Sequence, residues 1–296
     1  MAEEKNESAS SGIEKPAIKA SKMTKGRKTI AYLQQLKDDG IPIVQMCPVN
    51  RDAYFVMAAE MAGVDICRLT SPGEHVEHQI ANASWRIREV RSKANIIHIN
   101  FFMQTPTYVT NEEALKNGSI YMCNGADSLL LQGLKNEMCK FMSDNYLVLF
   151  GHVGAISGWQ TAKFGGYKRH GKTAEDALAV YRQAYEYQEN GMMAMTIELT
   201  PIEVTNAIAK KLRVPVINIA AGGAADGSEM VDLDTFNMMP SLASHAKAYA
   251  DFFEWAVGAY SAWAEDVRTG GYPADEHGWH MDPQELEIFL DKLDKL

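Results

Sequence analysis

The sequence predicts an α/β fold in which eight parallel strands close into a barrel, and three observations lead to this prediction. The chain has 296 residues, of which 46% are hydrophobic, enough for one large core. From Lys28 onward, short apolar runs alternate with segments of helical period. Strands that alternate with helices form a parallel sheet. No G-x-G-x-x-G motif follows the first run, which disfavours an open dinucleotide-binding sheet.

The first 26 residues are expected to stand apart from this barrel. They are rich in Ser, Lys and Glu and contain almost no large apolar residues. Such a segment cannot bury enough surface to offset the entropy lost on ordering. We therefore expect a flexible tail over residues 1–26 and one barrel domain, with additional C-terminal helices, over residues 27–296.

The predicted strands are short runs, most of them rich in Ile, Leu or Val, as strands buried on both faces are. Seven such runs cover residues 42–46, 66–70, 96–101, 128–132, 147–153, 195–199 and 215–221. An eighth strand is predicted near residues 229–233, and it favours a closed barrel over an open sheet.

Helices are predicted between these runs. Residues 51–62 and 173–190 carry apolar side chains at helical spacing. Thr173 is expected to cap the second of these helices, with Asp176 three residues further on. Gly191 follows this helix, where a left-handed residue commonly ends a helix.

The C-terminal third is predicted to be helical. Residues 244–268 form a long amphipathic run with aromatic side chains that include Trp255 and Trp263. Packing on the barrel core is one interpretation of this apolar face. A subunit interface is the other, because aromatic residues are enriched at interfaces.

Composition excludes several functions. The net charge is −9 without a long basic run, so we expect no nucleic-acid partner. No apolar run approaches the roughly 18 residues that a membrane span requires, and the N-terminus has no signal-peptide core. Four scattered cysteines have no zinc spacing and are expected to be reduced thiols in or near the core. These features predict a cytoplasmic protein without a membrane partner.

Candidate functional residues lie where the predicted strands end. In a barrel of this kind, catalytic groups sit at the carboxyl ends of strands and in the loops that follow. Polar residues at these ends are Thr70, Ser71, Asn100, Gln132, His152 and Glu198.

Two of these residues can transfer protons. Glu198 ends an apolar run, where we expect partial burial to raise the pKa of its carboxyl and suit it to acid–base catalysis. The alternative is a structural hydrogen bond to a loop. His152 lies between Gly151 and Gly154 and can donate to a substrate oxygen, or it can be a satisfied core histidine.

Two further segments have both a functional and a structural interpretation. Gly222 opens a small-residue loop whose backbone N–H groups can bind a phosphate or carboxylate, or simply form a tight turn. Residues 74–78 contain two histidines and two glutamates, which suit either a metal or a solvated helix start.

Several of these segments together resemble ketopantoate hydroxymethyltransferases. Residues 151–177 (GHVGAISGWQTAKFGGYKRHGKTAEDA) and 195–201 (MTIELTP) are similar to family segments, as are residues 214–227 and 254–277. The resemblance covers residues 28 to about 280. It implies a (β/α)₈ TIM barrel of the phosphoenolpyruvate/pyruvate type and a multi-subunit assembly. It also implies hydroxymethyl transfer from methylenetetrahydrofolate to 2-oxoisovalerate, with Mg²⁺ chelating the keto acid.

The family's metal-binding positions differ in this chain. The resemblance places Thr70, Asn100 and Gln132 where the family has the carboxylates that hold Mg²⁺. Ser71, His152 and Glu198 match the family, in which the histidine contacts substrate and the glutamate is the base. Mg²⁺ needs anionic oxygen ligands, so we expect no metal at this site.

The expected function is therefore an enzyme that makes or breaks a C–C bond next to a carbonyl without Mg²⁺. Glu198 would move the proton and His152 would assist it, while the substrate would be bound by Ser71, Thr70, Asn100, Gln132 and Gly222. We expect a small carbonyl or oxo-acid substrate, a homo-oligomer and no cofactor, with Mg²⁺ or methylenetetrahydrofolate only if the family reaction is retained. The alternatives are a genuine hydroxymethyltransferase, another reaction of the wider superfamily, and a non-catalytic binding protein.

Overall fold

The computed structural model describes the chain except residues 1–25, 50–51, 71–75, 105–106 and 224. The predicted tail, apart from Gly26, lies outside the described residues. The chain divides into two compact units, Met1–Leu233 and Asp234–Leu296. One domain over residues 27–296 stays a prediction, and each unit is described by itself below.

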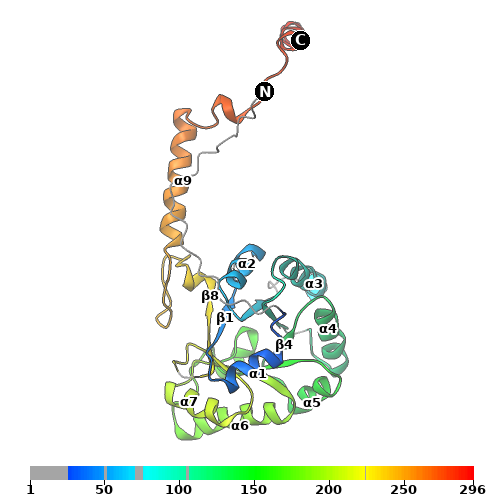
Figure 1. The fold of residues 1–296 in the computed structure, drawn as a ribbon, viewed down its shortest axis with the longest axis vertical. Helices are drawn as coiled ribbons and strands as arrows, with labels where there is room; N and C mark the ends of the chain where they lie inside the picture. The colour runs from blue at the N-terminus through cyan, green and yellow to red at the C-terminus, as the bar shows by residue number, and fades with distance from the viewer. Residues whose placement is uncertain (1–25, 50–51, 71–75, 105–106, 224) are drawn as a thin grey trace. The chain divides into compact units, whose positions relative to one another are not determined.

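The first unit is a closed barrel in which the strands follow one another from β1 to β8, all parallel, and β8 pairs with β1 (Figure 1). This confirms the predicted fold. The strands are β1 (Ile43–Cys47), β2 (Ile66–Thr70), β3 (His98–Phe102), β4 (Ser128–Leu130), β5 (Leu149–Gly154), β6 (Met192–Glu198), β7 (Val216–Ile219) and β8 (Gly227–Val231).

Helices alternate with these strands and surround the barrel (Figure 1). They are α1 (Ile30–Asp38), α2 (Ala53–Met61), α3 (Val76–Lys93), α4 (Asn111–Cys123), α5 (Asn136–Asp144), α6 (Ala174–Glu189), α7 (Ile202–Lys211) and the short α8 (Asp232–Thr235), with a 3₁₀ helix over Gly158–Phe164. The predicted cap of α6 is confirmed, since the Thr173 side chain accepts a hydrogen bond from Asp176 N at 3.2 Å.

The core has two layers because successive side chains of a strand face opposite sides. Side chains on the outer face, such as Leu69 and Ile99, pack beneath the helices. Inside the barrel, apolar residues near the strand starts, such as Ile43 and Phe150, pack against Leu33 of α1. Helix α1 therefore closes the amino-terminal opening, and the carboxyl ends of the strands lie at the other opening.

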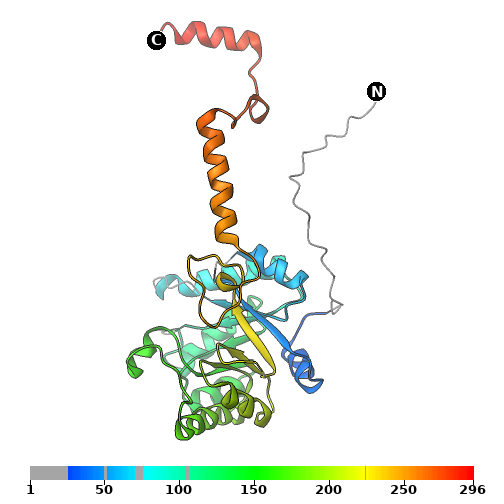
Figure 2. The same ribbon diagram turned by 90° about the vertical axis from the view of Figure 1, so that its left-hand side faces the viewer.

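The eighth strand begins at Gly227, earlier than the predicted start near residue 229. Figure 2 shows β8 in yellow beside β1 in blue, and the register pairs Gln45 with Glu229. A Cβ atom on Gly227 would lie 2.3 Å from Ile43 O, so glycine permits the close approach at this point. The register brings Gln45 and Glu229 to the same face of the barrel.

The cysteines are all free thiols. Cys47, Cys67 and Cys139 are buried, as predicted, whereas Cys123 is exposed. The prediction that all four lie in or near the core is therefore wrong for Cys123.

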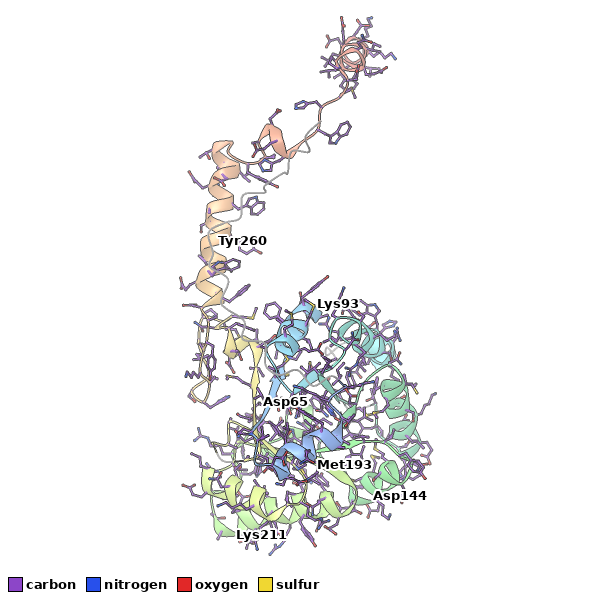
Figure 3. All side chains as sticks on the ribbon, viewed as in Figure 1. Asp65, Lys93, Asp144, Met193, Lys211 and Tyr260 are labelled. Atoms are coloured by element: carbon purple, nitrogen blue, oxygen red, sulfur yellow. The ribbon has the colours of Figure 1, made fainter. Side chains whose placement is uncertain are left out.

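The second unit contains α9 (Phe252–Thr269), a 3₁₀ turn (Asp275–His277) and α10 (Pro283–Leu293). Helix α9 begins at Phe252 and not near residue 244, since the preceding segment forms loop hydrogen bonds such as Tyr249 N to Thr235 O at 2.8 Å. No residue of α9 is buried, and Figure 3 labels Tyr260 on this helix. Among the described residues, no helix has the length and apolarity to cross a membrane.

Candidate active site

The interior of the barrel is polar above the apolar layer that α1 closes. Barrel interiors are ordinarily filled by branched apolar side chains, so a polar interior marks a site. Buried polar residues on the inner face are Gln45 (β1), Arg68 (β2), Asn100 (β3), Ser128 (β4), His152 (β5), Thr196 (β6) and Glu229 (β8). Glu198, Gln132 and Thr70 lie further toward the carboxyl ends of the strands.

His152 and Glu198, the two predicted catalytic residues, lie together. His152 Nε2 is 2.8 Å from Glu198 Oε2 and 2.9 Å from Ala155 O. Strand β5 brings them together because Gly154 pairs with Glu198 in the register. Gly154 has φ +82°, and a Cβ atom there would lie 2.2 Å from Glu198 O. Position 154 therefore requires glycine, so that the end of β6, which carries Glu198, can approach β5.

Gln132 determines which nitrogen of His152 carries the proton. The backbone N–H of Ser157 donates to Gln132 Oε1 at 3.0 Å, so the amide NH₂ group of Gln132 must face His152 Nδ1, 3.3 Å away. Nδ1 is then an acceptor. Nε2 faces two acceptors, Ala155 O and the Glu198 carboxylate, and carries the hydrogen. The network thus places the imidazole hydrogen of His152 that faces Glu198 on Nε2.

Tyr167 completes the surroundings of Glu198, and sequence reasoning did not identify it. Its hydroxyl donates to Glu198 Oε1. Burial and the contact with Glu198 raise the pKa of Tyr167, so the phenol remains protonated and able to donate. The signal was present in the GGYK segment, but a tyrosine after two glycines does not reveal its partner.

The pKa of the Glu198 carboxyl is lowered, and the expectation that it is raised is wrong. Burial does favour the protonated form, but the hydrogen bond and charge of His152, the hydrogen bond from Tyr167 and the charge of Arg68 together outweigh it. Glu198 is therefore an ionised carboxylate at neutral pH and can accept a proton.

Arg68 is the second residue that sequence reasoning missed. Its Nη2 donates to Thr196 Oγ1 at 2.5 Å, and its Nε lies 3.1 Å from Glu229 Oε1. The guanidinium carbon lies 5.5 Å from the centre of the Phe150 ring. Burial raises the pKa of Glu229, and the charge of Arg68 opposes this rise. The available signal was a charged residue within an otherwise apolar strand, ICRLT.

Asn100 belongs to a chain of buried hydrogen bonds. His98 Nδ1 donates to Lys28 O at 3.0 Å, so its Nε2 accepts from Ser128 Oγ at 2.8 Å. Ser128 Oγ in turn accepts from Asn100 Nδ2 at 2.8 Å. The side-chain oxygen of Asn100 has no hydrogen-bond partner among the described residues. Asn100 thus presents an acceptor that lacks a partner, and an acceptor does not stabilise an oxyanion.

The remaining predicted residues are less informative. Thr70 ends β2 and is partly exposed, whereas Ser71, Glu74 and His75 lie outside the described residues. Gly222 has φ +78°, and a Cβ atom there would lie 2.1 Å from Ile202 Cγ1. Close packing on α7 therefore accounts for this glycine, and substrate binding by its backbone stays a prediction.

The donor set of the described residues does not fit Mg²⁺. This ion prefers anionic oxygens, and Thr70, Asn100 and Gln132 offer neutral ones. Gln132 Oε1 already accepts hydrogen bonds from Ser157, and the Arg68 guanidinium lies in the same interior. No group of three or more His, Cys, Asp or Glu side chains in the described part of the chain is placed to hold a metal.

A closed parallel barrel with a carboxylate and an imidazole at the carboxyl ends of its strands has the architecture of barrel enzymes. A family model described as ketopantoate hydroxymethyltransferase matches residues 27–275, and the chain belongs to this family.

Curated relatives extend over nearly the whole chain. 3-Methyl-2-oxobutanoate hydroxymethyltransferase 1 of Methylibium petroleiphilum is 28% identical over 282 residues, which are 91% of this chain and 95% of that protein. The 3-methyl-2-oxobutanoate hydroxymethyltransferase of Bacillus licheniformis is 29% identical over 273 residues, 88% of this chain and 98% of that protein.

Solved structures agree with the fold. A 2,3-dimethylmalate lyase of the PEP mutase/isocitrate lyase superfamily has a TM-score of 0.50 at 13% identity, covering 90% of this chain and 93% of that one. A putative phosphonomutase from Burkholderia cenocepacia J2315 has a TM-score of 0.52 at 11% identity, covering 80% and 99%. These similarities agree with the predicted (β/α)₈ barrel fold.

Proposed function

We propose that this chain makes or breaks a C–C bond next to the carbonyl of a small oxo-acid, with Glu198 as the base and without Mg²⁺. The observation that carries the proposal is the ionised Glu198 carboxylate, held by His152 at 2.8 Å and by Tyr167. A base fixed by two donors keeps one geometry, which favours proton transfer at a defined carbon.

The proposed step is the removal of a proton from the carbon next to the substrate carbonyl. The proton passes to a carboxylate oxygen of Glu198, and the electron pair of the C–H bond becomes the C=C bond of an enolate. The enolate carbon then attacks a one-carbon electrophile, or the reverse sequence releases one. Positive charge at the site, which the Arg68 guanidinium supplies, would stabilise the enolate oxygen.

Hydrogen exchange tests the base directly. The protein is incubated in D₂O with EDTA and a panel of 2-oxo-acids that includes 3-methyl-2-oxobutanoate, and loss of the C3–H signal is followed by NMR. We expect exchange by the wild type and a loss of at least about 100-fold in Glu198→Gln, because an amide cannot accept the proton. Glu203→Gln on α7 is the matched control. Equal exchange by wild type and Glu198→Gln would refute the assignment.

A second candidate is the family reaction itself, hydroxymethyl transfer to 3-methyl-2-oxobutanoate. The match of the family model over residues 27–275 favours it. The same incubation separates the two candidate functions when methylenetetrahydrofolate is added and the reaction is run once with EDTA and once with Mg²⁺. Product formed only with Mg²⁺ would favour the family reaction and contradict metal-free chemistry.

A further inference from the structure

Four neighbouring strands contribute buried polar atoms that have no hydrogen-bond partner among the described residues. By geometry these atoms are both amide atoms of Gln45, Oδ1 of Asn100 and Oε2 of Glu229, although Gln45 lies close enough to Glu229 to lower its pKa. Nε of Arg68 has only its ion pair. The side chains come from β1, β3, β8 and β2 and are at most 6% exposed. A buried polar atom without a partner is costly, so a cluster of them indicates a place where a polar molecule binds.

Arg68 spans this cluster. It extends from β2 to Thr196 on β6, which is the opposite strand of an eight-stranded barrel. Its guanidinium rests on the ring of Phe150, which belongs to the apolar layer closed by α1. The guanidinium therefore forms the floor of the polar interior, with Glu198 one layer nearer the carboxyl end of β6 than Thr196.

The bonds of Arg68 leave part of its donor capacity unused. Nη2 donates to Thr196 and Nε faces Glu229, whereas Nη1 has no partner among the described residues. The two side-chain amides of the site, those of Gln132 and Asn100, cannot bind a carboxylate in place of Arg68. The NH₂ group of Gln132 donates to His152, and Asn100 presents an acceptor. An arginine with a free donor edge is well suited to bind a carboxylate.

We propose that Arg68 is the anion-binding residue of this site. Its guanidinium binds the carboxylate of the substrate, and Glu229 holds the guanidinium in position through the contact at Nε. The inference rests on the proposed function for the identity of the substrate, and it adds the residue that recognises the acid group.

Calorimetric titration with 3-methyl-2-oxobutanoate and its neutral methyl ester, both in EDTA, tests the proposal. The wild type should bind the acid at least about tenfold more tightly than the ester, since a charged hydrogen-bonded pair is lost with the ester. Arg68→Leu combined with Glu229→Leu removes both buried charges together, a replacement that proteins often tolerate. This double variant should lose the preference for the acid. A folded double variant that keeps the preference overturns the proposal.

Glu229→Gln provides an independent test that leaves Arg68 in place. Glutamine keeps an oxygen that can accept from Nε and so hold the guanidinium in position, but it removes the negative charge that competes with the ligand for Arg68. Affinity for the acid should therefore rise about threefold to tenfold. Unchanged or weaker affinity would contradict the role of Arg68. Arg68-dependent binding without hydrogen exchange would refute only the proposed function. Exchange with binding that is independent of Arg68 would refute only this inference.

Discussion

At the scale of single residues, the site is determined by which atoms already have partners. Gln132 aligns with a position where the family resemblance implies a carboxylate, yet its two amide atoms contact Ser157 and His152. A carboxylate could accept from Ser157 but could not donate to Nδ1 of His152. The amide of Gln132 thus has a role of its own, since it determines which nitrogen of His152 carries the proton. The loss of a metal ligand alone would not suggest this role.

Replacing Gln132 by Glu should change the protonation of His152. A carboxylate beside Nδ1 requires a proton on that nitrogen, so the imidazole should become doubly protonated or switch tautomer. Ring ¹⁵N shifts at neutral pH measure this directly. We expect the Nε2–H pattern in the wild type and a protonated Nδ1 in Gln132→Glu. Identical ring shifts in the two proteins would contradict the tautomer assignment.

Replacing Tyr167 by Phe should alter the pH dependence of activity. The Tyr167 hydroxyl helps to lower the pKa of Glu198, so its removal raises this pKa. The base must be ionised to act, and the acidic limb of the rate profile should therefore move to higher pH. Tyr181→Phe on α6 serves as a control, and an acidic limb that does not move would argue against the contact.

At the scale of elements, the strands could be predicted from the sequence, but the contacts between side chains on different strands could not. Runs such as residues 66–70 are apolar because both faces of a barrel strand are covered, and this pattern is visible in the sequence. Arg68 lies within one of these runs, but its partner Glu229 is on the last strand. Only barrel closure brings β8 near β2, so no local pattern could reveal the pair.

In the site too, some features could be predicted from the local sequence, and others depend on residues that are far apart in the chain. Glu198 and His152 could be chosen because each ends an apolar run in a fold whose catalytic groups lie at strand ends. The lowered pKa of Glu198 could not be predicted, because it depends on Tyr167 and Arg68. Their contacts with Glu198 and its surroundings form only in the folded chain.

Strand β3 carries a titratable group that should govern acid stability. Burial lowers the pKa of His98 from 6.5 to about 4, even though the charge of Asp127 and the hydrogen bond to Lys28 O oppose the shift. The unfolded chain binds more protons than the folded chain between these two values. Stability is therefore lost as the pH falls from 6.5 toward 4.

The expected loss of unfolding free energy from His98 is about 2 kcal/mol between about pH 7 and about pH 5. Urea unfolding at the two pH values measures it. His98→Gln keeps one donor and one acceptor but does not titrate, so this variant should lose less stability over the same interval. Equal losses in the two proteins would show that His98 does not control acid stability.

At the scale of the whole molecule, the second unit has a helix, α9, with apolar side chains and no buried residue in the part of the chain that the structure describes. The aromatic side chains of α9 include Trp255, Tyr260 and Trp263, which are 59%, 69% and 55% exposed. Figure 3 labels Tyr260 on this helix. Clustered exposed aromatic residues mark interfaces in ordinary proteins. We propose that these side chains of α9 form an apolar face that associates with other copies of the chain, as predicted for a homo-oligomer.

Light scattering coupled to size-exclusion chromatography tests this association. The wild type should have a mass above that of one chain. Trp263→Glu places a charge within the apolar face, where burial in an interface would cost several kcal/mol, so the mass should fall toward the monomer. Glu265→Gln on the same helix is the matched control and should keep the wild-type mass, since a polar position contributes little to an apolar contact. A monomeric wild type, or an unchanged mass for Trp263→Glu, would show that this face is not the interface.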